Sequence, residues 1–453
     1  MRERVRIQIS DHFNYRKLLK FVMPTIVMMI VTSIYGVIDG LFVSNFVGKT
    51  PFAALNLIMP FIMILGGMGF MIGTGGTALV SKVVGEGDRE KANRYFTMVV
   101  IFAVLLGLFL TAVGIAVMRP IARLLGATDN MIEHCVLYGR IVVGFTTFFM
   151  LQNIFQSFLA AAEKPKLGLA VTLIAGCTNA ALDALFIVVF RWGLVGAAVA
   201  TGIGQVLGGV IPLVYFARKN SSLLRFTKTK LEIKPLLLAC GNGSSELLTN
   251  VASSIVSMLY NGQLMRLMER MELNGENGVS AYGVLMYVQF IFLAIEIGYT
   301  IGSAPIVGYN YGAENRDELK NVFKKSILIM AVSGTVLTGL AQALAVPIAK
   351  LFVGYDEELY RLTVHAFRLF SFAFVFSGIG IYSSGFFTAL NNGLISAILA
   401  ILRSVVFQVA FVFLLPYLFG LDGIWWAMLA TEVAAAIAAV VFFIAKHKKY
   451  GYA

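Results

Sequence analysis

The feature that most constrains the fold of this 453-residue chain is a succession of long apolar runs with little sequence between them. A helix needs about 20 mostly apolar residues to cross a bilayer. The runs are continuous, whereas strands of a membrane barrel alternate in polarity over segments of about ten residues. Twelve runs are long enough, at residues 18–43, 51–78, 95–118, 134–162, 167–190, 193–217, 235–262, 278–308, 322–346, 360–390, 393–418 and 421–445. The sequence therefore predicts an all-α membrane protein with twelve transmembrane helices.

The distribution of charge predicts the orientation of these helices. Twelve spans place both termini on one side, and the loops on that side carry 25 of the 36 Lys and Arg residues, against 8 on the opposite side. Excess positive charge marks cytoplasmic loops. We therefore expect a multi-pass protein of the plasma membrane, most simply a bacterial cell membrane, with both termini in the cytoplasm. The net charge of +12 is explained by these loops and does not indicate a nucleic-acid partner.

An internal repeat divides the chain into two similar halves. Residues 78–96 and 305–323 align at an offset of 227, which pairs Gly85 with Gly312 and Phe96 with Phe323. The same offset aligns 157–170 with 384–397 and 193–206 with 420–433, and an insertion near 262–278 would explain why the first helix of each half is out of register. Such a long match indicates duplication.

The repeat predicts two six-helix bundles. Because six is even, both halves enter the membrane from the same side, and the pseudo-twofold axis that relates them runs along the membrane normal. We expect an N-lobe at 1–220 and a C-lobe at 221–453, joined by the basic cytoplasmic linker 218–234. Transporters built this way bind substrate between the halves, so the repeat favours a transporter over a channel or an enzyme.

Several segments resemble the MATE family of multidrug and toxic-compound extrusion transporters, and specifically its multidrug and DinF-like branch within the MOP flippase superfamily. These are SIYGVIDGLFVSNFVG at 33–48, VSKVVGEGDREKA at 80–92, AAEKPKLGLAVTLIAGCTNAALDALFI at 161–187 and GLVGAAVATGIGQ at 193–205. The likeness extends over about residues 15–445. It implies export of amphiphilic compounds, driven by an inward flow of protons or sodium ions.

Polar residues inside the predicted spans of the N-lobe are the main candidates for function, because ionisable groups are costly in a membrane. Asp39 lies on the first helix, and Asn179 and Asp183 lie four residues apart on one face of the fifth. A desolvated carboxylate can take up and release a proton near neutral pH. By resemblance, these three residues and Thr201 form the cation-coupling site. Pro24 would let the first helix bend.

The C-lobe offers weaker candidates. Glu246 and Glu296 could serve as an ion or substrate site, although the family resemblance also implies an aspartate on the tenth helix, and residues 370–385 contain no carboxylate. Aromatic and sulfur-containing side chains suit the wall of a cavity that accepts varied organic cations. As substrate-cavity residues we name Tyr35, Met63, Gln152, Met286 and Gln289.

We expect a monomer that needs no cofactor or metal and has no enzymatic activity. The segment Gly48-Lys49-Thr50 imitates the end of a P-loop, but Val43 stands where that motif requires glycine. The energy for transport must then come from an ion gradient, or there is no pumping. Two other functions fit the sequence less well: a flippase for lipid-linked saccharides, and a non-transporting membrane sensor or scaffold.

The charge count can be tested by labelling. We predict that single cysteines introduced into 82–94 and 218–234 react with membrane-impermeant thiol reagents only from the cytoplasmic side. Labelling from the outside of intact cells would show that the predicted orientation is inverted.

Overall fold

The computed structural model describes residues 7–273 and 275–452, and these contain helices but no strand. The first half contains α1 (Tyr15–Phe46), α2 (Lys49–Gly85), α3 (Arg89–Leu124), α4 (Asp129–Gly144), α5 (Thr146–Ala161), α6 (Pro165–Asp183), the π-helical turn η1 (Ala184–Val189) and α7 (Gly193–Ala217). The second half contains α8 (Ile233–Arg270), α9 (Gly275–Gly312), α10 (Arg316–Val353), α11 (Glu357–Phe370), the 3₁₀ turn η2 (Ser371–Ala373), α12 (Phe374–Ala389), α13 (Gly393–Ile401), the π-helical turn η3 (Leu402–Phe407), α14 (Gln408–Phe419) and α15 (Leu421–Tyr450).

Each of the twelve predicted spans corresponds to one helix or one interrupted helix. Within the described residues, ten helices are long and apolar enough to cross a membrane, and the pair α4 and α5, bent by 53°, gives an eleventh span. The twelfth is α8, which is 38 residues long but carries the polar stretch GNGSSELLTN at 241–250. An all-helical structure is what a bilayer requires, because each helix satisfies its own backbone hydrogen bonds.

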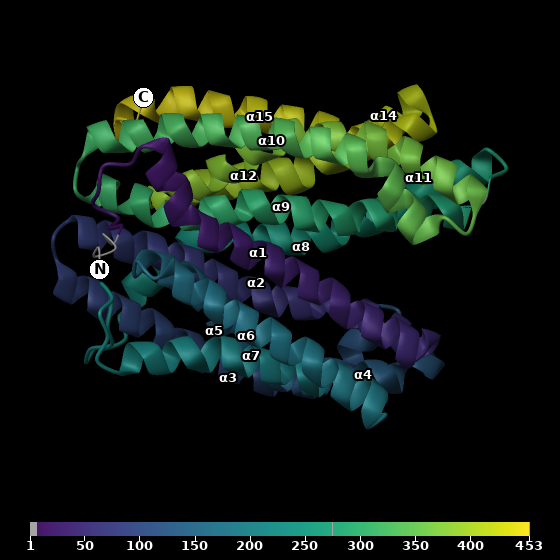
Figure 1. Cartoon of the computed structure of the whole chain (residues 1–453), viewed down its shortest axis with the longest axis horizontal. Coiled ribbons are helices and arrows are strands. Elements are labelled where there is room, and N and C mark those ends of the chain that lie inside the picture. The colour runs from purple at the N-terminus through teal and green to yellow at the C-terminus, as the bar shows by residue number, and fades with distance from the viewer. Residues whose placement is uncertain (1–6, 274, 453) are drawn as a thin grey trace, which may run out of the picture.

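The helices form two bundles that meet along four helices (Figure 1). Helices α3, α5, α6 and α7 lie on one side, and α10, α12 and α15 lie on the other, with α1, α2, α8 and α9 between them. Both termini lie at the same end of the molecule. At the opposite end the bundles diverge toward α4 and α11.

The internal repeat is visible in equivalent contacts of the two halves. Asp88 caps α3 by accepting a hydrogen bond from the backbone N–H of Lys91, and 227 residues later Asn315 caps α10 through the N–H of Glu318. Behind each cap lies a phenylalanine, Phe96 or Phe323, at the centre of an aromatic cluster. The ring pairs are Phe96–Phe216 at 4.9 Å and Phe96–Phe226 at 5.1 Å in the first half, and Phe323–Phe443 at 4.9 Å and Phe323–Tyr452 at 4.8 Å in the second.

Glycines let the two bundles touch through their backbones. A Cβ added at Gly75 of α2 would lie 1.9 Å from the carbonyl oxygen of Ala239 on α8, and one added at Gly85 would lie 2.1 Å from that of Tyr309 on α9. In return, a Cβ at Gly243 of α8 would lie 1.9 Å from the carbonyl oxygen of Met71. Small residues serve this purpose between membrane helices, because close packing must replace the missing hydrophobic drive.

This contact predicts opposite outcomes for two substitutions on the same helix. Gly243→Ala should destabilise the protein by about 1–3 kcal/mol through overpacking. Gly241→Ala should be neutral or stabilising, because an added Cβ there meets nothing within 4 Å and alanine favours a helix by about 1 kcal/mol over glycine. Thermal unfolding of the detergent-solubilised variants would measure both. Equal midpoints would contradict a backbone contact at Gly243.

Candidate functional site

The centre of the N-lobe holds a pair of buried carboxyl groups. Asp39 on α1 is 7% exposed, and Asp183 at the end of α6 is fully buried. The charges of the two groups interact with each other. Among the described residues neither forms a salt bridge, and apart from the contact between the two carboxyls Asp183 has no hydrogen-bonding partner. Two adjacent carboxylates with no counter-charge cannot both stay ionised at low cost, so the pair is suited to hold a proton or a small cation.

Three neighbours complete the surroundings of this pair. The Thr201 hydroxyl on α7 donates to Asp39 Oδ1 at 3.5 Å. Asn179 lies one turn before Asp183, is 4% exposed, and neither atom of its amide has a partner among the described residues. Tyr138, buried on α4, lies within electrostatic range of both carboxyls. The structure thus gathers the four predicted residues and adds Tyr138, which sequence reasoning missed because a tyrosine within an apolar run carries no distinctive signal.

The backbone around the pair departs from regular α-helix. The π-helical turn η1 begins directly after Asp183 and continues to Val189. Such turns widen the helix by one residue and occur often at functional sites. The break therefore changes the direction in which successive side chains point at the position of the carboxyl pair.

Pro24 lies where α1 contacts the other bundle. Its ring removes the backbone N–H that would donate to the carbonyl of Lys20, yet α1 is one helix from Tyr15 to Phe46. A Cβ added at Gly298 of α9 would lie 2.6 Å from Cα of Ile26, two residues after the proline. The part of α1 that lacks a backbone hydrogen bond is thus in close contact with α9 of the C-lobe.

In the C-lobe two buried acidic side chains, Glu432 and Glu296, have polar partners. Arg403 and Glu432 form a two-pronged ion pair, with nitrogen to oxygen distances of 2.7 and 2.9 Å, and Glu432 is fully buried. Glu296 is also fully buried, and the Ser377 hydroxyl lies 2.7 and 2.9 Å from its two oxygens. The presence of Arg403 inside an apolar run was a signal for this network, but its partners could not be identified from the sequence.

Glu246 has a different environment. It lies on α8 at a small cavity of about 20 Å³ between the bundles, together with Thr74, Thr77 and Ser157 of the N-lobe and Thr300 and Thr388 of the C-lobe. Arg403 is near enough to interact with it electrostatically. Hydroxyl groups from both halves and the carboxyl group of Glu246 line this cavity, so it can accept a small cationic or polar group.

The predicted substrate-cavity residues separate into two groups. Gln152 donates to the hydroxyl of Tyr35 at 3.1 Å, and it lines a second small cavity, of about 10 Å³, inside the N-lobe. The residues that share this cavity include Met28, Thr172, Pro212 and the buried Gln156, whose amide atoms have no partner among the described residues. In contrast, Met63, Met286 and Gln289 line neither of these two cavities.

Comparison with known proteins gives consistent matches over the whole chain. The MatE family model matches residues 24–185 and 248–414. The chain is 25% identical over 442 residues to a multidrug export protein MepA of Staphylococcus haemolyticus, covering 97% of this chain and 95% of that protein. It is also 25% identical over 434 residues to the protein of that name from Staphylococcus aureus strain MRSA252, with 94% and 93% covered.

Solved structures share the fold. A multidrug resistance MATE transporter of the MOP superfamily in an outward-facing conformation superposes with a TM-score of 0.91 and 21% identity, over 100% of both chains. A MATE structure in complex with MaL6 superposes with a TM-score of 0.89 and 22% identity, over 97% of both chains.

The buried ion pair of the C-lobe leads to a stability prediction. Arg403→Met should destabilise the protein by about 3–5 kcal/mol, because it leaves the Glu432 carboxylate buried without a counter-charge. Adding Glu432→Met should restore most of that loss, since replacing both partners by apolar side chains is often neutral. Chemical unfolding of the single and double variants would measure the difference. A double variant as unstable as Arg403→Met would contradict this account.

Proposed function

Because the chain belongs to the MatE family, we propose that it is an ion-coupled antiporter that exports amphiphilic, often cationic compounds by alternating access. As a member, it is a membrane transporter and not an enzyme. Relatives that match nearly its whole length are named multidrug export proteins. The inward movement of a proton or a sodium ion supplies the energy for export, and no further cofactor takes part.

The observation that carries the proposal is the unpaired carboxyl pair of the N-lobe. A charge in a membrane is costly unless it is paired, and the same protein pairs Glu432 with Arg403 in its other lobe. Asp39 and Asp183 have no such basic partner among the described residues. Their arrangement suits reversible binding of a proton or a sodium ion, with Asn179 and Thr201 supplying further ligands or hydrogen bonds.

Substrate and ion occupy different places in this proposal. The small cavity between the bundles marks the place where the substrate binds once the bundles separate, and Glu246 attracts its positive charge. The N-lobe, 1–220, and the C-lobe, 221–453, rock about this cavity and expose it first to one side of the membrane and then to the other. Loading of Asp39 alters the hydrogen bond from Thr201 and is transmitted along α1 toward Pro24, where the helix can bend.

The protein acts as a monomer in the plasma membrane, with both termini in the cytoplasm. The excess of Lys and Arg on the side of the termini supports this orientation. An acidic rather than basic cavity supports export of cations over the transfer of anionic lipid-linked saccharides. The end of the molecule that carries both termini in Figure 1 then faces the cytoplasm.

The test uses purified protein in proteoliposomes that enclose a pH indicator. We predict that a proton gradient drives a lipophilic cationic dye in the opposite direction, and that Asp183→Asn abolishes this movement because the site can no longer exchange a proton. Asp129→Asn is the matched control, since Asp129 is an exposed acid of the same lobe. Replacing the proton gradient with a sodium gradient identifies the ion.

Two results would count against the coupling site. If both Asp39→Asn and Asp183→Asn leave gradient-driven movement intact, the ion is not coupled at this pair, and Glu246 becomes the leading candidate. If no gradient moves the dye in wild-type vesicles, the antiport itself is wrong for this substrate class.

A further inference from the structure

The segment that precedes α1 lies across both bundles at the end where the termini meet. Residues 7–14 are not helical, but the side chains of Ile9 and Phe13 are almost completely buried, at 1% and 0% exposure. Within the segment, the N–H of Gln8 donates to Asp11, and Lys17 of α1 pairs with Asp11 at 2.9 Å. We call residues 7–14 the N-terminal strap. Its two apolar side chains are buried, whereas Gln8, Ser10, His12 and Asn14 are exposed.

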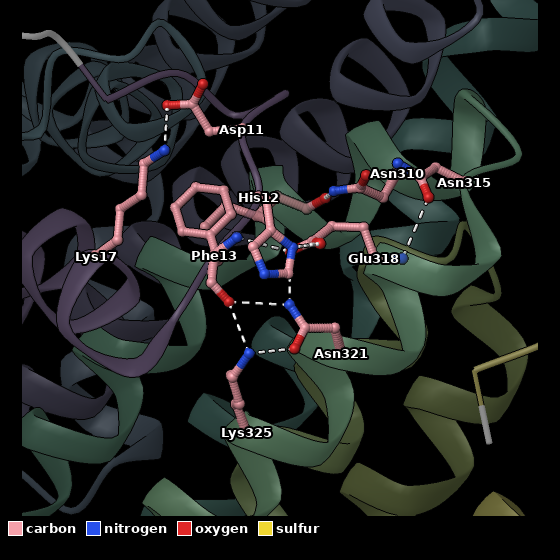
Figure 2. A network of polar contacts seen from close by, with 10 residues as sticks. Asp11, His12, Phe13, Lys17, Asn310, Asn315, Glu318, Asn321 and Lys325 are labelled. Atoms are coloured by element: carbon pink, nitrogen blue, oxygen red, sulfur yellow. Dashed lines mark hydrogen bonds and ion pairs between the residues drawn. The ribbon is translucent and has the colours of Figure 1, made fainter.

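The strap is bound to the C-lobe through the first turns of α10 (Figure 2). The backbone N–H of Phe13 donates to Glu318 Oε1 at 2.9 Å, and His12 Nδ1 lies 2.6 Å from the other oxygen of that carboxylate. The carbonyl of Phe13 accepts hydrogen bonds from the Asn321 amide at 2.9 Å and from the Lys325 ammonium at 2.8 Å. Asn321 in turn contacts both Glu318 and Lys325. Both backbone groups of Phe13 are therefore held by charged side chains of α10.

The other end of the strap is bound to the N-lobe. The backbone N–H of Ile9 donates to Glu163 Oε1 at 3.0 Å, and Glu163 lies in the turn between α5 and α6. Ile9 and Phe13, four positions apart in the strap, are thus attached to different bundles. If the bundles separated at this end, one of these attachments would have to break.

The second half shows the reciprocal arrangement. The linker that leads into α8 of the C-lobe is bound to α3 of the N-lobe. The backbone N–H of Arg225 donates to Asn93 at 2.9 Å, and that of Thr227 donates to Thr97 at 3.0 Å. Each half therefore sends the segment before its first helix to the third helix of the other half. The two crossings lie at the same end as the glycine contacts of Gly85 and Gly312.

From these contacts we propose that the N-terminal strap is a latch that holds the two bundles closed at the end that carries the termini, and that Glu318 is the residue that fastens it. The inference rests on the proposed alternating access, in which this end must open once in each cycle. Loss of the Glu318 charge weakens the grip on Phe13 and His12 and shifts the molecule toward the state that is open at this end. Glu318 acts by positioning the strap and touches neither ion nor substrate.

The test measures the distance between the bundles directly. Spin labels at Arg89→Cys of α3 and Lys324→Cys of α10, both exposed on the surface, are introduced after Cys135, Cys177 and Cys240 have been replaced by alanine. Electron–electron double resonance in lipid nanodiscs then gives the populations of short and long distances. Glu318→Gln should raise the ratio of long to short distances about tenfold, as expected for weakening a hydrogen bond to a charged group.

Asp317→Asn is the matched control. Asp317 is the neighbouring acid in the same first turn of α10, so Asp317→Asn makes the same change of charge. Asp317 is exposed, and no hydrogen bond or ion pair joins it to the strap among the described residues. It should leave the distances as in wild type. The latch would be overturned if Glu318→Gln gave the same distance distribution as wild type. It would also be overturned if Asp317→Asn shifted the distribution as much as Glu318→Gln.

A second variant covers the case in which Glu318→Gln does not fold. His12→Ala removes the contact of the exposed His12 side chain with Glu318 but leaves Glu318 in place, and it should raise the ratio of long to short distances in the same direction. A His12→Ala distribution equal to that of wild type would then overturn the proposal. Because these measurements read distances and not transport, they can support the latch even if the proposed antiport fails, and the reverse also holds.

Discussion

Every feature of this protein depends on the constraint that no backbone polar group can be left unpaired in a bilayer. Each helix meets that requirement by itself, so the architecture depends on how the helices pack. Between the two bundles, backbone packs against backbone at Gly75, Gly85 and Gly243. The rest of the arrangement follows: two bundles of similar design, a shared cavity at their contact, and chain segments that cross from one to the other at the end where both termini lie.

The two lobes treat buried charge in different ways. In the C-lobe, Arg403 neutralises Glu432, and Ser377 satisfies Glu296. In the N-lobe, Asp39 and Asp183 face each other in a setting whose described residues supply no base. A duplicated fold has thus kept its architecture while its polar interior has diverged. The paired acid Glu432 suits a scaffold, and the unpaired acids of the N-lobe suit an exchangeable ion.

Much of the fold could be predicted from the sequence because it depends on local or self-comparing signals. Run length gives the spans, and even α8, whose middle is polar, was found because its flanks are apolar. The fixed offset of 227 located Phe96 and Phe323 at equivalent positions. Pairings between distant helices could not be predicted in this way. Nothing in the sequence joins Arg403 to Glu432, Phe13 to Glu318, or Tyr138 to the aspartates. The prediction of Met63, Met286 and Gln289 as cavity residues rested on residue type alone, and these three line neither of the two cavities.

Glycine at the contact between the bundles affects how readily they can separate and dock again. Ordering a long side chain costs up to about 2 kcal/mol in lost rotamer freedom, whereas ordering glycine adds no such cost. At these glycines the meeting surfaces of α2, α8 and α9 have no side-chain rotamers to order when they come together again. Bundles joined in this manner can part and re-dock without a search among side-chain arrangements, so each closure starts from surfaces that are already in their final shape. A seam of interdigitating leucines would hold as tightly, but it would have to be repacked every time.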